Sequence, residues 1–283
     1  MSAAGPASIG APAADDAIWP LRDLREAIGR LWPGAAVEAV ATIDSTNTEL
    51  MRRARAGRCD PVLLVAGHQS AGRGRLGRQW HAGPDRADLR PLTFSLGLPL
   101  APADWAGLSL AVGVAVAEAI DPHRRMPLML KWPNDLWIEG RKLGGILIET
   151  ALPGPGSAGG AGGRYLVVGV GINLATPEVD GLRTPPAGLR EWQPEASAPE
   201  LLTLLAEPLV QAVCRFEAEG FEPFAAGFAQ RDLLHGRPLA LSDGTGGTGD
   251  GVGPKGELRV LTEHGPRLVT SAEVSVRPQA ETA

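Results

Sequence analysis

A helix predicted over residues 105–120 has apolar side chains on almost every side. The segment reads WAGLSLAVGVAVAEAI, and Pro122 follows shortly after it. A helix without a polar face must be covered all round, so we predict that it is buried against a sheet. The chain of 283 residues is long enough to build such a core. None of its apolar runs reaches the roughly 18 residues that a membrane-spanning helix needs.

Short apolar runs elsewhere in the chain predict the strands of that sheet. They are residues 62–66, a run near residue 95, LMLKW and LWI on either side of a PND turn, KLGGILIET, and YLVVGVGINL. Capping and spacing signals predict helices over residues 21–32, from about Asn47 to Gly57, and from Ser197 to Gly220, with a kink at Pro208 and a helical continuation over 221–235. We therefore expect an α+β fold, with a mixed and largely antiparallel sheet and helices packed on one face of it.

The composition changes along the chain, which predicts separate regions, and the overall charge limits the kind of partner that the chain can bind. From Gly236 the pattern changes to short alternating segments between Gly-rich turns, which predicts a separate small β domain over 236–283. Residues 1–20 have no signal-peptide pattern and are expected to form a flexible tail. The net charge is −5 and the pI about 5.6, which argues against a nucleic-acid-binding protein. Two distant cysteines give no disulfide framework, so we expect a cytoplasmic protein.

The loop GRGRLGRQW, residues 72–80, has three glycines with three arginines between them. Glycine lets backbone amides approach an anion, and each guanidinium offers a fork of donors that matches carboxylate or phosphate. The pattern predicts a loop that wraps a small anion. A solvated arginine turn and a nucleic-acid patch are equally compatible with the loop taken alone. It is not a dinucleotide-binding GxGxxG site, because no helical pattern follows it.

Two lysines belong to neighbouring predicted strands. Lys131 lies in the apolar strand before the PND turn, where a lysine needs a partner or a ligand, and Lys142 begins the following strand. Gly144 and Gly145 beside it leave room for a ligand. Two ammonium groups on adjoining strands suit a carboxylate that is being joined to a phosphate. An exposed hairpin lysine is the structural alternative for Lys142, and an ordinary turn is the alternative for the PND segment.

Other polar residues point less clearly to chemistry. Asn173 ends the strand VVGVGINL, where it has either a structural role or a role in binding a base. Ser45 and Thr46 are most simply helix caps. The five histidines have no metal-ligand spacing and no nucleophile motif is visible, so we expect neither a metal site nor triad chemistry.

In order and spacing, the segments DSTN, GHQSAGRGRLGRQW, KWPNDLW, RKLGGILIE and VGVGINL resemble the catalytic domain of the biotin protein ligases. The resemblance runs from about residue 38 to 235. It implies a class II synthetase-like catalytic domain over 21–235, followed by an SH3-like β barrel. It also implies ATP-dependent biotinylation of a lysine in a biotin carboxyl carrier domain, such as that of acetyl-CoA carboxylase, through biotinyl-5′-AMP. Biotin and ATP would be substrates, with Mg²⁺ accompanying the nucleotide.

The resemblance also implies site residues. Lys142 would bind the biotin carboxylate and the α-phosphate, Lys131 would support the same charge, and Asp135 would orient or deprotonate the carrier lysine. The other implied binding residues are Ser45, Thr46, Asn47 and Gln69 for biotin, Gly72, Arg73, Gly74, Arg75 and Arg78 for the loop over the adenylate, Gly144 and Gly145 beside Lys142, and Trp80 and Asn173 at the adenine end.

The sequence departs from the family pattern in ways that shape these expectations. About 37 residues precede the resemblance, so we expect no winged-helix repressor domain and no DNA partner. A Gly-rich insertion lies at 151–163, and the segment after Trp80 is long. A homodimer is left open and no membrane partner is expected. The nearest alternative is a lipoate or octanoate protein ligase or transferase, which shares the fold; the GRGRLGRQW and KWPND segments favour biotin.

Overall fold

The structure is a computed structural model that describes residues 18–80, 89–152, 163–179, 181, 184–270 and 276–278. The predicted tail, most of the Gly-rich insertion and the segment after Trp80 lie largely outside the described residues. The described chain forms two sheets, and the predicted site lies on the larger one.

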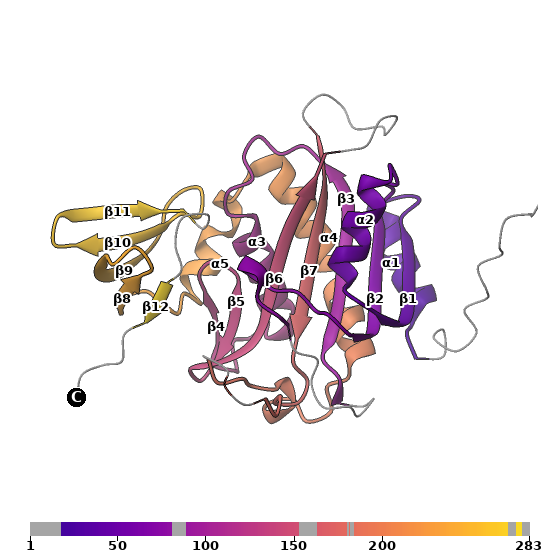
Figure 1. Ribbon diagram of the computed structural model, residues 1–283, viewed down its shortest axis with the longest axis horizontal. Helices are drawn as coiled ribbons and strands as arrows, with labels where there is room; N and C mark the ends of the chain where they lie inside the picture. The colour runs from indigo at the N-terminus through magenta and orange to yellow at the C-terminus, as the bar shows by residue number, and fades with distance from the viewer. Residues whose placement is uncertain are drawn as a thin grey trace, which may run out of the picture.

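The larger sheet contains seven strands of the described chain (Figure 1). In spatial order they are β1 (Ala36–Ile43), β2 (Val62–Gln69), β3 (Leu92–Leu100), β7 (Arg164–Ile172), β6 (Arg141–Ala151), β5 (Asp135–Ile138) and β4 (Leu128–Lys131). β1 and β2 pair in parallel and all other neighbours are antiparallel. The predicted mixed, largely antiparallel sheet is therefore confirmed.

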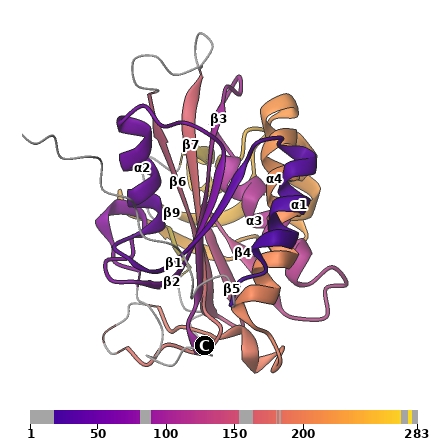
Figure 2. The same ribbon diagram turned by 90° about the vertical axis from the view of Figure 1, so that its right-hand side faces the viewer.

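Helices cover both faces of this sheet, which differs from the prediction of one covered face. Figure 2 shows α1 (Leu21–Leu31), α3 (Leu108–Ile120) and α4 (Ala198–Glu219) on one side and α2 (Thr46–Arg55) on the other. Alternate residues of β2 point to opposite faces. Accordingly, Leu63 joins the main core, whereas Leu64 packs with Leu50 of α2. The central strands are thus buried on both faces, which explains their nearly continuous apolar sequences.

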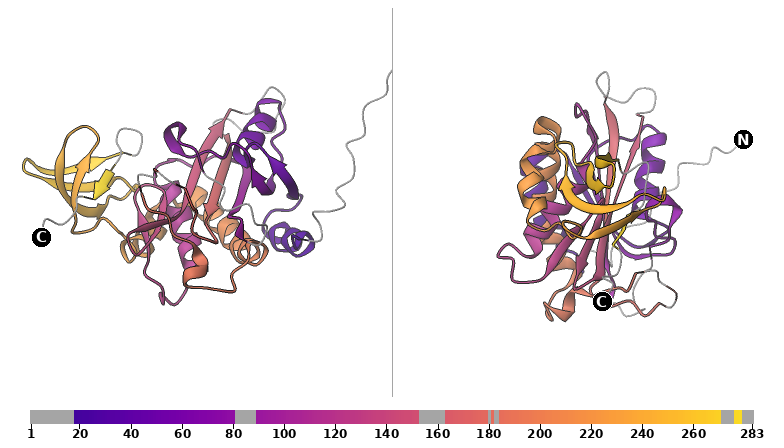
Figure 3. Two further views of the ribbon diagram at one scale, coloured as in Figure 1. Left: turned by 60° about the horizontal axis from the view of Figure 1, so that its bottom comes forward. Right: turned by 90° about the vertical axis from the view of Figure 1, so that its left-hand side faces the viewer.

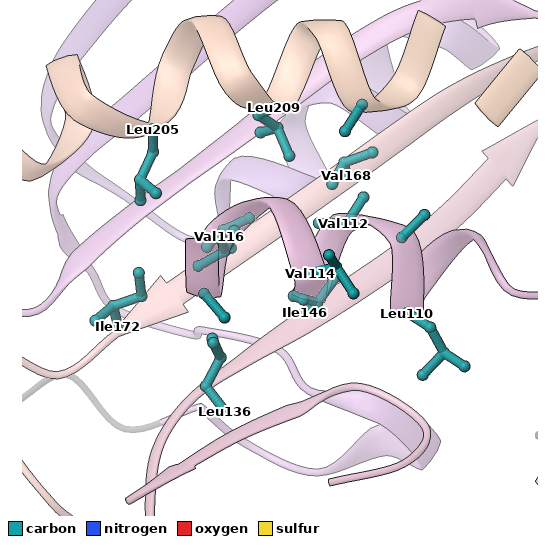
Figure 4. Packing of buried hydrophobic residues seen from close by; sticks show 14 of the residues in the cluster. Leu110, Val112, Val114, Val116, Leu136, Ile146, Val168, Ile172, Leu205 and Leu209 are labelled. Carbon is teal, nitrogen blue, oxygen red and sulfur yellow. The ribbon is translucent and has the colours of Figure 1, made fainter. Parts of the chain in front are cut away.

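The fully apolar helix α3 is buried as predicted. It lies between α4 and the sheet, and Figure 4 shows its side chains packed among Leu205 and Leu209 of α4 and Ile146 and Val168 of the sheet. Burial of each such side chain stabilises the fold by about 1.5–3 kcal/mol, so this layer is a major part of the core. No helix in the described part of the chain has the length and apolarity needed to cross a membrane.

The second sheet is small and antiparallel and lies beyond the β4 end of the first (Figure 3). Its order is β11 (Gly265–Val269), β10 (Leu258–Thr262), β9 (Gly246–Val252), β8 (Pro238–Leu241) and β12 (Val276–Pro278). Where it meets the first sheet, the buried indole of Trp132 donates a hydrogen bond to the carbonyl of Gly256, 3.0 Å away. At the same junction, a Cβ on Gly256 would lie 2.8 Å from Cα of Gly107. The absence of side chains at both glycines therefore allows this close approach.

The helical prediction over residues 221–235 is wrong beyond α5 (Ala225–Ala229). The backbone after α5 pairs with β4 instead, since Leu130 donates to the carbonyl of Arg231 at 2.7 Å and Leu233 donates to the carbonyl of Leu130 at 2.9 Å. The side chain of Arg231 reaches Oδ2 of Asp121 at 3.3 Å, and both side chains are about 5% exposed or less. A tertiary strand contact and a buried ion pair therefore replace the local helix.

Candidate functional site

A cavity of about 170 Å³ lies on the face of the large sheet that α2 covers. It is surrounded by the start of α2, the end of β2, the loop 72–80, the β4–β5 turn, the middle of β6 and the end of β7. Most of the predicted site residues line this cavity: Ser45, Thr46, Asn47, Gln69, Arg73, Gly74, Arg75, Arg78, Trp80, Lys131, Asp135, Lys142 and Gly145. Segments that are far apart in the sequence therefore meet in one place.

One end of the cavity, formed by Ser45, Thr46 and Gln69, is polar but uncharged; we call it the polar end. Ser45 caps α2, because its Oγ accepts from the N–H of Thr48 at 3.4 Å. Of the two residues expected to be caps, Ser45 is therefore the N-cap, and Thr46 is the first residue of α2. The N–H and the hydroxyl of Thr46 both donate to Oε1 of Gln69, at 2.7 and 3.1 Å. The helix start and the strand end thus hold each other in place.

The other end of the cavity, formed by Arg75, Lys131 and Lys142, is cationic; we call it the cationic end. The ammonium of Lys142 is 2.7 Å from Oδ1 of Asp135 on the neighbouring strand. Nζ of Lys131 lies 5.3 Å from the centre of the Trp137 ring, within the range of a cation–π contact. The chain has three lysines in all, Lys131, Lys142 and Lys255, and two of them are at this end.

A β-bulge turns Lys142 toward the cavity. β5 and β6 pair Leu136 with Gly144 but Trp137 with Lys142, so Leu143 is an extra residue in β6. A bulge shifts the alternation of side chains, which places Lys142 on the same face as Gly145 although they are three residues apart. A Cβ on Gly145 would lie 3.4 Å from both Nζ of Lys142 and Oδ1 of Asp135. The bare backbone at Gly145 therefore leaves room beside the ion pair.

The loop 72–80 is a tight hairpin across the mouth of the cavity. The N–H of Gly74 donates to the carbonyl of Arg78 at 2.7 Å, and that of Trp80 donates to the carbonyl of Gly72 at 2.9 Å. A Cβ on Gly72 would lie 2.7 Å from the carbonyl oxygen of Trp80, so this glycine serves the closure of the hairpin and does not line the cavity. Leu76, at the tip with φ 57°, is 72% exposed.

Arg75 and Arg73 fix the hairpin to the body of the protein. Nη1 of Arg75 donates to Oδ1 of Asn134 in the β4–β5 turn at 3.2 Å. Burial lowers the pKa of the Arg75 guanidinium, with Asp135 opposing the shift and Arg78 adding to it. The group nevertheless stays cationic, because the pKa of arginine starts so high. Nη1 of Arg73 is 3.0 Å from Oε1 of Glu149 on β6.

Trp80 lies flat against the backbone of β7. A Cβ on Gly171 would come within 2.8 Å of Cε2 and Cζ2 of the indole, so the glycine makes the seat for the ring. The indole N–H is buried and has no hydrogen-bond partner among the residues that the structure describes. It is thus a donor available to a ligand in the cavity.

Two predicted site residues lie behind the cavity instead of lining it. A Cβ on Gly144 would meet the carbonyl of Gly171 at 2.6 Å, so Gly144 allows β6 and β7 to approach. The Asn173 amide donates to the carbonyls of Ala187 at 3.1 Å and Lys142 at 3.5 Å. Because the Ala187 N–H also donates to the Lys142 carbonyl, at 2.9 Å, Asn173 helps to hold the backbone of Lys142.

Arg141, the residue before Lys142, is tied to Glu191 by a two-pronged ion pair of 3.0 and 2.6 Å. Hydrogen bonding to Arg141 lowers the pKa of Glu191 to about 2, and the N–H of Gly188 and the hydroxyl of Thr176 lower it further. Because this pKa is below its ordinary value of 4.5, the contact stabilises the fold fully above about pH 4.5. The stabilisation is lost as the pH falls toward 2.

We expect the variant Glu191→Gln to lower the free energy of unfolding at pH 7 by about 1 kcal/mol, since solvent screens an ion pair this exposed. The difference from the unchanged protein should shrink between pH 5 and pH 2. Urea unfolding at several pH values measures it. Glu219→Gln, at an exposed ion pair with Arg215, is the control and should change little. A difference that is as large at pH 3 as at pH 7 would contradict the assignment.

Several residues of the site carry no clear functional signal in the sequence. Asn134 holds Arg75 and, through its amide, the carbonyl of Ile146 at 2.7 Å, whereas an ordinary turn was one of the two interpretations of its segment. Ser95 and Glu149 are polar residues within apolar strands. Such an interruption was the available signal, since a buried polar group needs a partner. Their partners come from distant segments, which the sequence alone does not reveal.

The comparisons with known proteins agree with this geometry. The family model for the biotin/lipoate A/B protein ligase family matches residues 39–173. The bifunctional ligase/repressor BirA of Escherichia coli is 32% identical over 266 residues, which cover 91% of this chain and 78% of that protein. The biotin–acetyl-CoA-carboxylase ligase of Paracoccus denitrificans is 33% identical over 244 residues, which cover 83% of this chain and 98% of that protein.

The chain belongs to the biotin/lipoate A/B protein ligase family. A solved structure agrees with this assignment. The biotin protein ligase from Aquifex aeolicus in complex with biotin and ATP superimposes with a TM-score of 0.70 at 27% identity. The superposition covers 86% of this chain and 99% of that one. The superposition extends well beyond residues 39–173. The structural similarity therefore covers more of this chain than the family model does.

Proposed function

We propose that the chain is an ATP-dependent ligase that joins biotin to a lysine of a biotin carboxyl carrier domain through biotinyl-5′-AMP. The observation that carries the proposal is the cavity itself, which combines an uncharged polar end with a cationic end that holds two of the chain's three lysines. A ligand with a neutral ring at one end and a carboxylate at the other matches both ends. The names of the relatives from Escherichia coli and Paracoccus denitrificans support the same reaction class.

In the first step, the biotin carboxylate attacks the α-phosphorus of ATP and pyrophosphate leaves. Lys142 would bind the attacking carboxylate and the α-phosphate, where negative charge accumulates, and Lys131 and Arg75 would add to the positive field. Lys142 already holds one carboxylate oxygen, that of Asp135 at 2.7 Å. We propose that the substrate competes with Asp135 for this ammonium, so that binding frees Asp135 for the second step.

Magnesium would come to the site with the nucleotide. Asp135 is the one carboxylate among the described residues that line the cavity. A single carboxylate fits an ion that keeps most of its ligands as water and substrate phosphates. Asp135 would be the ligand from this chain, and the ion would neutralise charge on the phosphates during transfer.

In the second step, the carrier lysine attacks the acyl carbon and AMP leaves. The amine must be neutral to attack, and Asp135 is placed to orient it or to accept its proton. The mixed anhydride hydrolyses in water, so the hairpin 72–80 would protect it until the carrier arrives.

Cys59 and Cys214 are both free, which supports a reducing compartment such as the cytoplasm.

The alternative substrates, lipoate and octanoate, fit the polar end less well. Ser45, Thr46 and Gln69 offer hydrogen-bond donors and acceptors that the ureido ring of biotin uses. A dithiolane ring or an alkyl end would leave without a partner those donors and acceptors that the protein does not satisfy itself, at a cost of about 1–3 kcal/mol each. Biotin is therefore the substrate that we propose.

The direct test is to mix the purified protein with MgATP and, separately, biotin, lipoate or octanoate, and to identify the acyl-adenylate by mass spectrometry. We expect biotinyl-adenylate from biotin alone. Formation of lipoyl- or octanoyl-adenylate in its place would overturn the choice of substrate. No adenylate from any of the three acids would overturn the reaction class.

We expect Arg75→Ala to release the adenylate about 10–100 times faster, the effect of losing one charge-assisted hydrogen bond of about 1.5–3 kcal/mol. The reason is the contact between Arg75 and Asn134, which fixes the hairpin to the β4–β5 turn. Rapid filtration of preformed adenylate measures the release rate. Arg58→Ala, outside the cavity, is the control. An unchanged release rate in the Arg75 variant would show that the hairpin is not held closed by this residue.

A further inference from the structure

The carboxylate of Glu149 holds two partners from distant segments. Nη1 of Arg73 in the hairpin lies 3.0 Å from Oε1 and 3.4 Å from Oε2, and Oε2 also accepts a hydrogen bond of 3.0 Å from Nδ2 of Asn47 in α2. The side chain is 19% exposed. Bonds to a charged acceptor are strong in such a partly dehydrated place. One carboxylate therefore joins the hairpin at the mouth of the cavity to the helix that begins at the polar end.

The contact continues from Asn47 to the polar end. Oδ1 of Asn47 lies 2.7 Å from Oγ of Ser95, and the same Oγ lies 2.7 Å from Oγ1 of Thr46, which donates to Gln69. A series of close polar contacts thus runs from Arg73 through Glu149, Asn47 and Ser95 to the polar end, with the single hydroxyl hydrogen of Ser95 shared between Asn47 and Thr46.

The protein itself satisfies the side chain of Asn47. Its amide nitrogen donates to Glu149 and also to the carbonyl of Leu147 at 3.2 Å. Asn47 is 3% exposed, and its amide fits because Gly169 has no side chain: a Cβ there would lie 2.1 Å from Oδ1. Although Asn47 lines the cavity, its orientation is set by Glu149 and the sheet.

From these contacts we infer that Glu149 is a positioning residue that couples the two ends of the cavity. Closure of the hairpin brings Arg73 onto Glu149, which orders Asn47 and, through Ser95, the Thr46–Gln69 pair. By reciprocity, a ligand that orders the polar end favours the closed hairpin over the cationic end. The inference rests on the proposed function, in which biotin takes the polar end and ATP the cationic end.

The test is the effect of nucleotide on biotin affinity in Glu149→Gln. Glutamine has the same shape but no charge and one acceptor oxygen in place of two, so it loses the charge-assisted bond to Arg73 while an oxygen remains for Asn47. Calorimetry measures the biotin Kd with and without the α,β-methylene analogue of ATP, which does not transfer its α-phosphate. We expect the analogue to tighten biotin binding at least about 10-fold in the unchanged protein, within the usual range of coupling between sites. In the variant the effect should fall below about 2-fold.

Two further variants separate positioning from general damage. Thr150→Val changes the next residue of β6, which points to the other face and bonds Arg164, so it should retain the full effect of nucleotide. Arg73→Gln removes the other partner from a side chain that is 46% exposed, so the fold should tolerate it. It should uncouple the ligands as Glu149→Gln does, and the double variant should be no worse than either single one.

The outcomes distinguish the inference from the proposed function. Full coupling in Glu149→Gln would overturn the inference. If that variant does not fold, full coupling in Arg73→Gln would do the same. An unchanged protein that forms biotinyl-adenylate but shows no coupling would overturn the inference alone. An unchanged protein that neither binds biotin nor forms the adenylate would overturn the proposed function.

Discussion

Lys142→Ala is expected to lower the rate of pyrophosphate release with biotin by at least about 10²–10³-fold, the usual cost of removing one group that stabilises transition-state charge. The β-bulge at Leu143 turns this side chain into the cavity, and its ammonium lies beside the carboxylate of Asp135. Alanine would remove the positive charge at the point where the carboxylate and the α-phosphate meet. Rapid-quench measurement of the first turnover isolates this step.

Lys255→Ala is the matched control, because Lys255 is the remaining lysine of the chain and pairs with Asp104 at the surface. It should leave the rate unchanged. Lys142→Arg keeps the charge but replaces a compact ammonium with a planar fork, and we expect it to remain slow. A rate within about 10-fold of the unchanged protein in Lys142→Ala would remove Lys142 from the chemistry, since a principal charge-stabilising group contributes more than that.

Arg231→Met is expected to lower the free energy of unfolding by about 3–5 kcal/mol, because it leaves the buried carboxylate of Asp121 without its cation. Arg231 also donates to the carbonyl of Leu128 at 3.0 Å, so one side chain connects α3, β4 and the segment after α5. Urea unfolding measures the loss. The double variant with Asp121→Asn should recover part of it, since no buried charge then remains unpaired.

Arg30→Met is the control for this prediction. Arg30 pairs with Glu26, but both side chains are more than 60% exposed. Exposed pairs contribute about 0–1 kcal/mol, so this variant should change stability little. Equal effects at Arg30 and Arg231 would show that the buried pair does not hold the segment after α5 in place.

The elements that the sequence predicted well carry their own local signals. The cap of α4 at Ser197 and the burial of α3 follow from a few neighbouring residues. The position of α2 did not follow, because apolar spacing defines the buried side of a helix but not the face of the sheet that receives it. The helix prediction over residues 230–235 was wrong for a similar reason, since the backbone partner of this segment, Leu130, is about a hundred positions away.

The candidate site, too, was predictable where the signal is local and not where it depends on tertiary contacts. Glycines and cations in GRGRLGRQW and RKLGGILIE identified the segments that meet at the cavity. The bulge that turns Lys142 and the contact from Glu149 to Arg73, 76 residues apart, depend on the register of the sheet and on hairpin geometry. Neither leaves a mark in the local sequence. The chemical roles of the cavity residues remain predictions for the experiments above.

The junction between the two sheets has a consequence for exchanging parts between family members. Trp132 follows Lys131 directly, and its buried indole donates a hydrogen bond to Gly256 in the turn between β9 and β10. A chimera joined after residue 235 would keep both sheets whole and still separate these partners. A graft would therefore have to carry the turn around Gly256 and match the glycine at position 107, although neither belongs to the cavity. A graft between family members must therefore exchange both contacting surfaces of this junction, not one continuous segment of the chain.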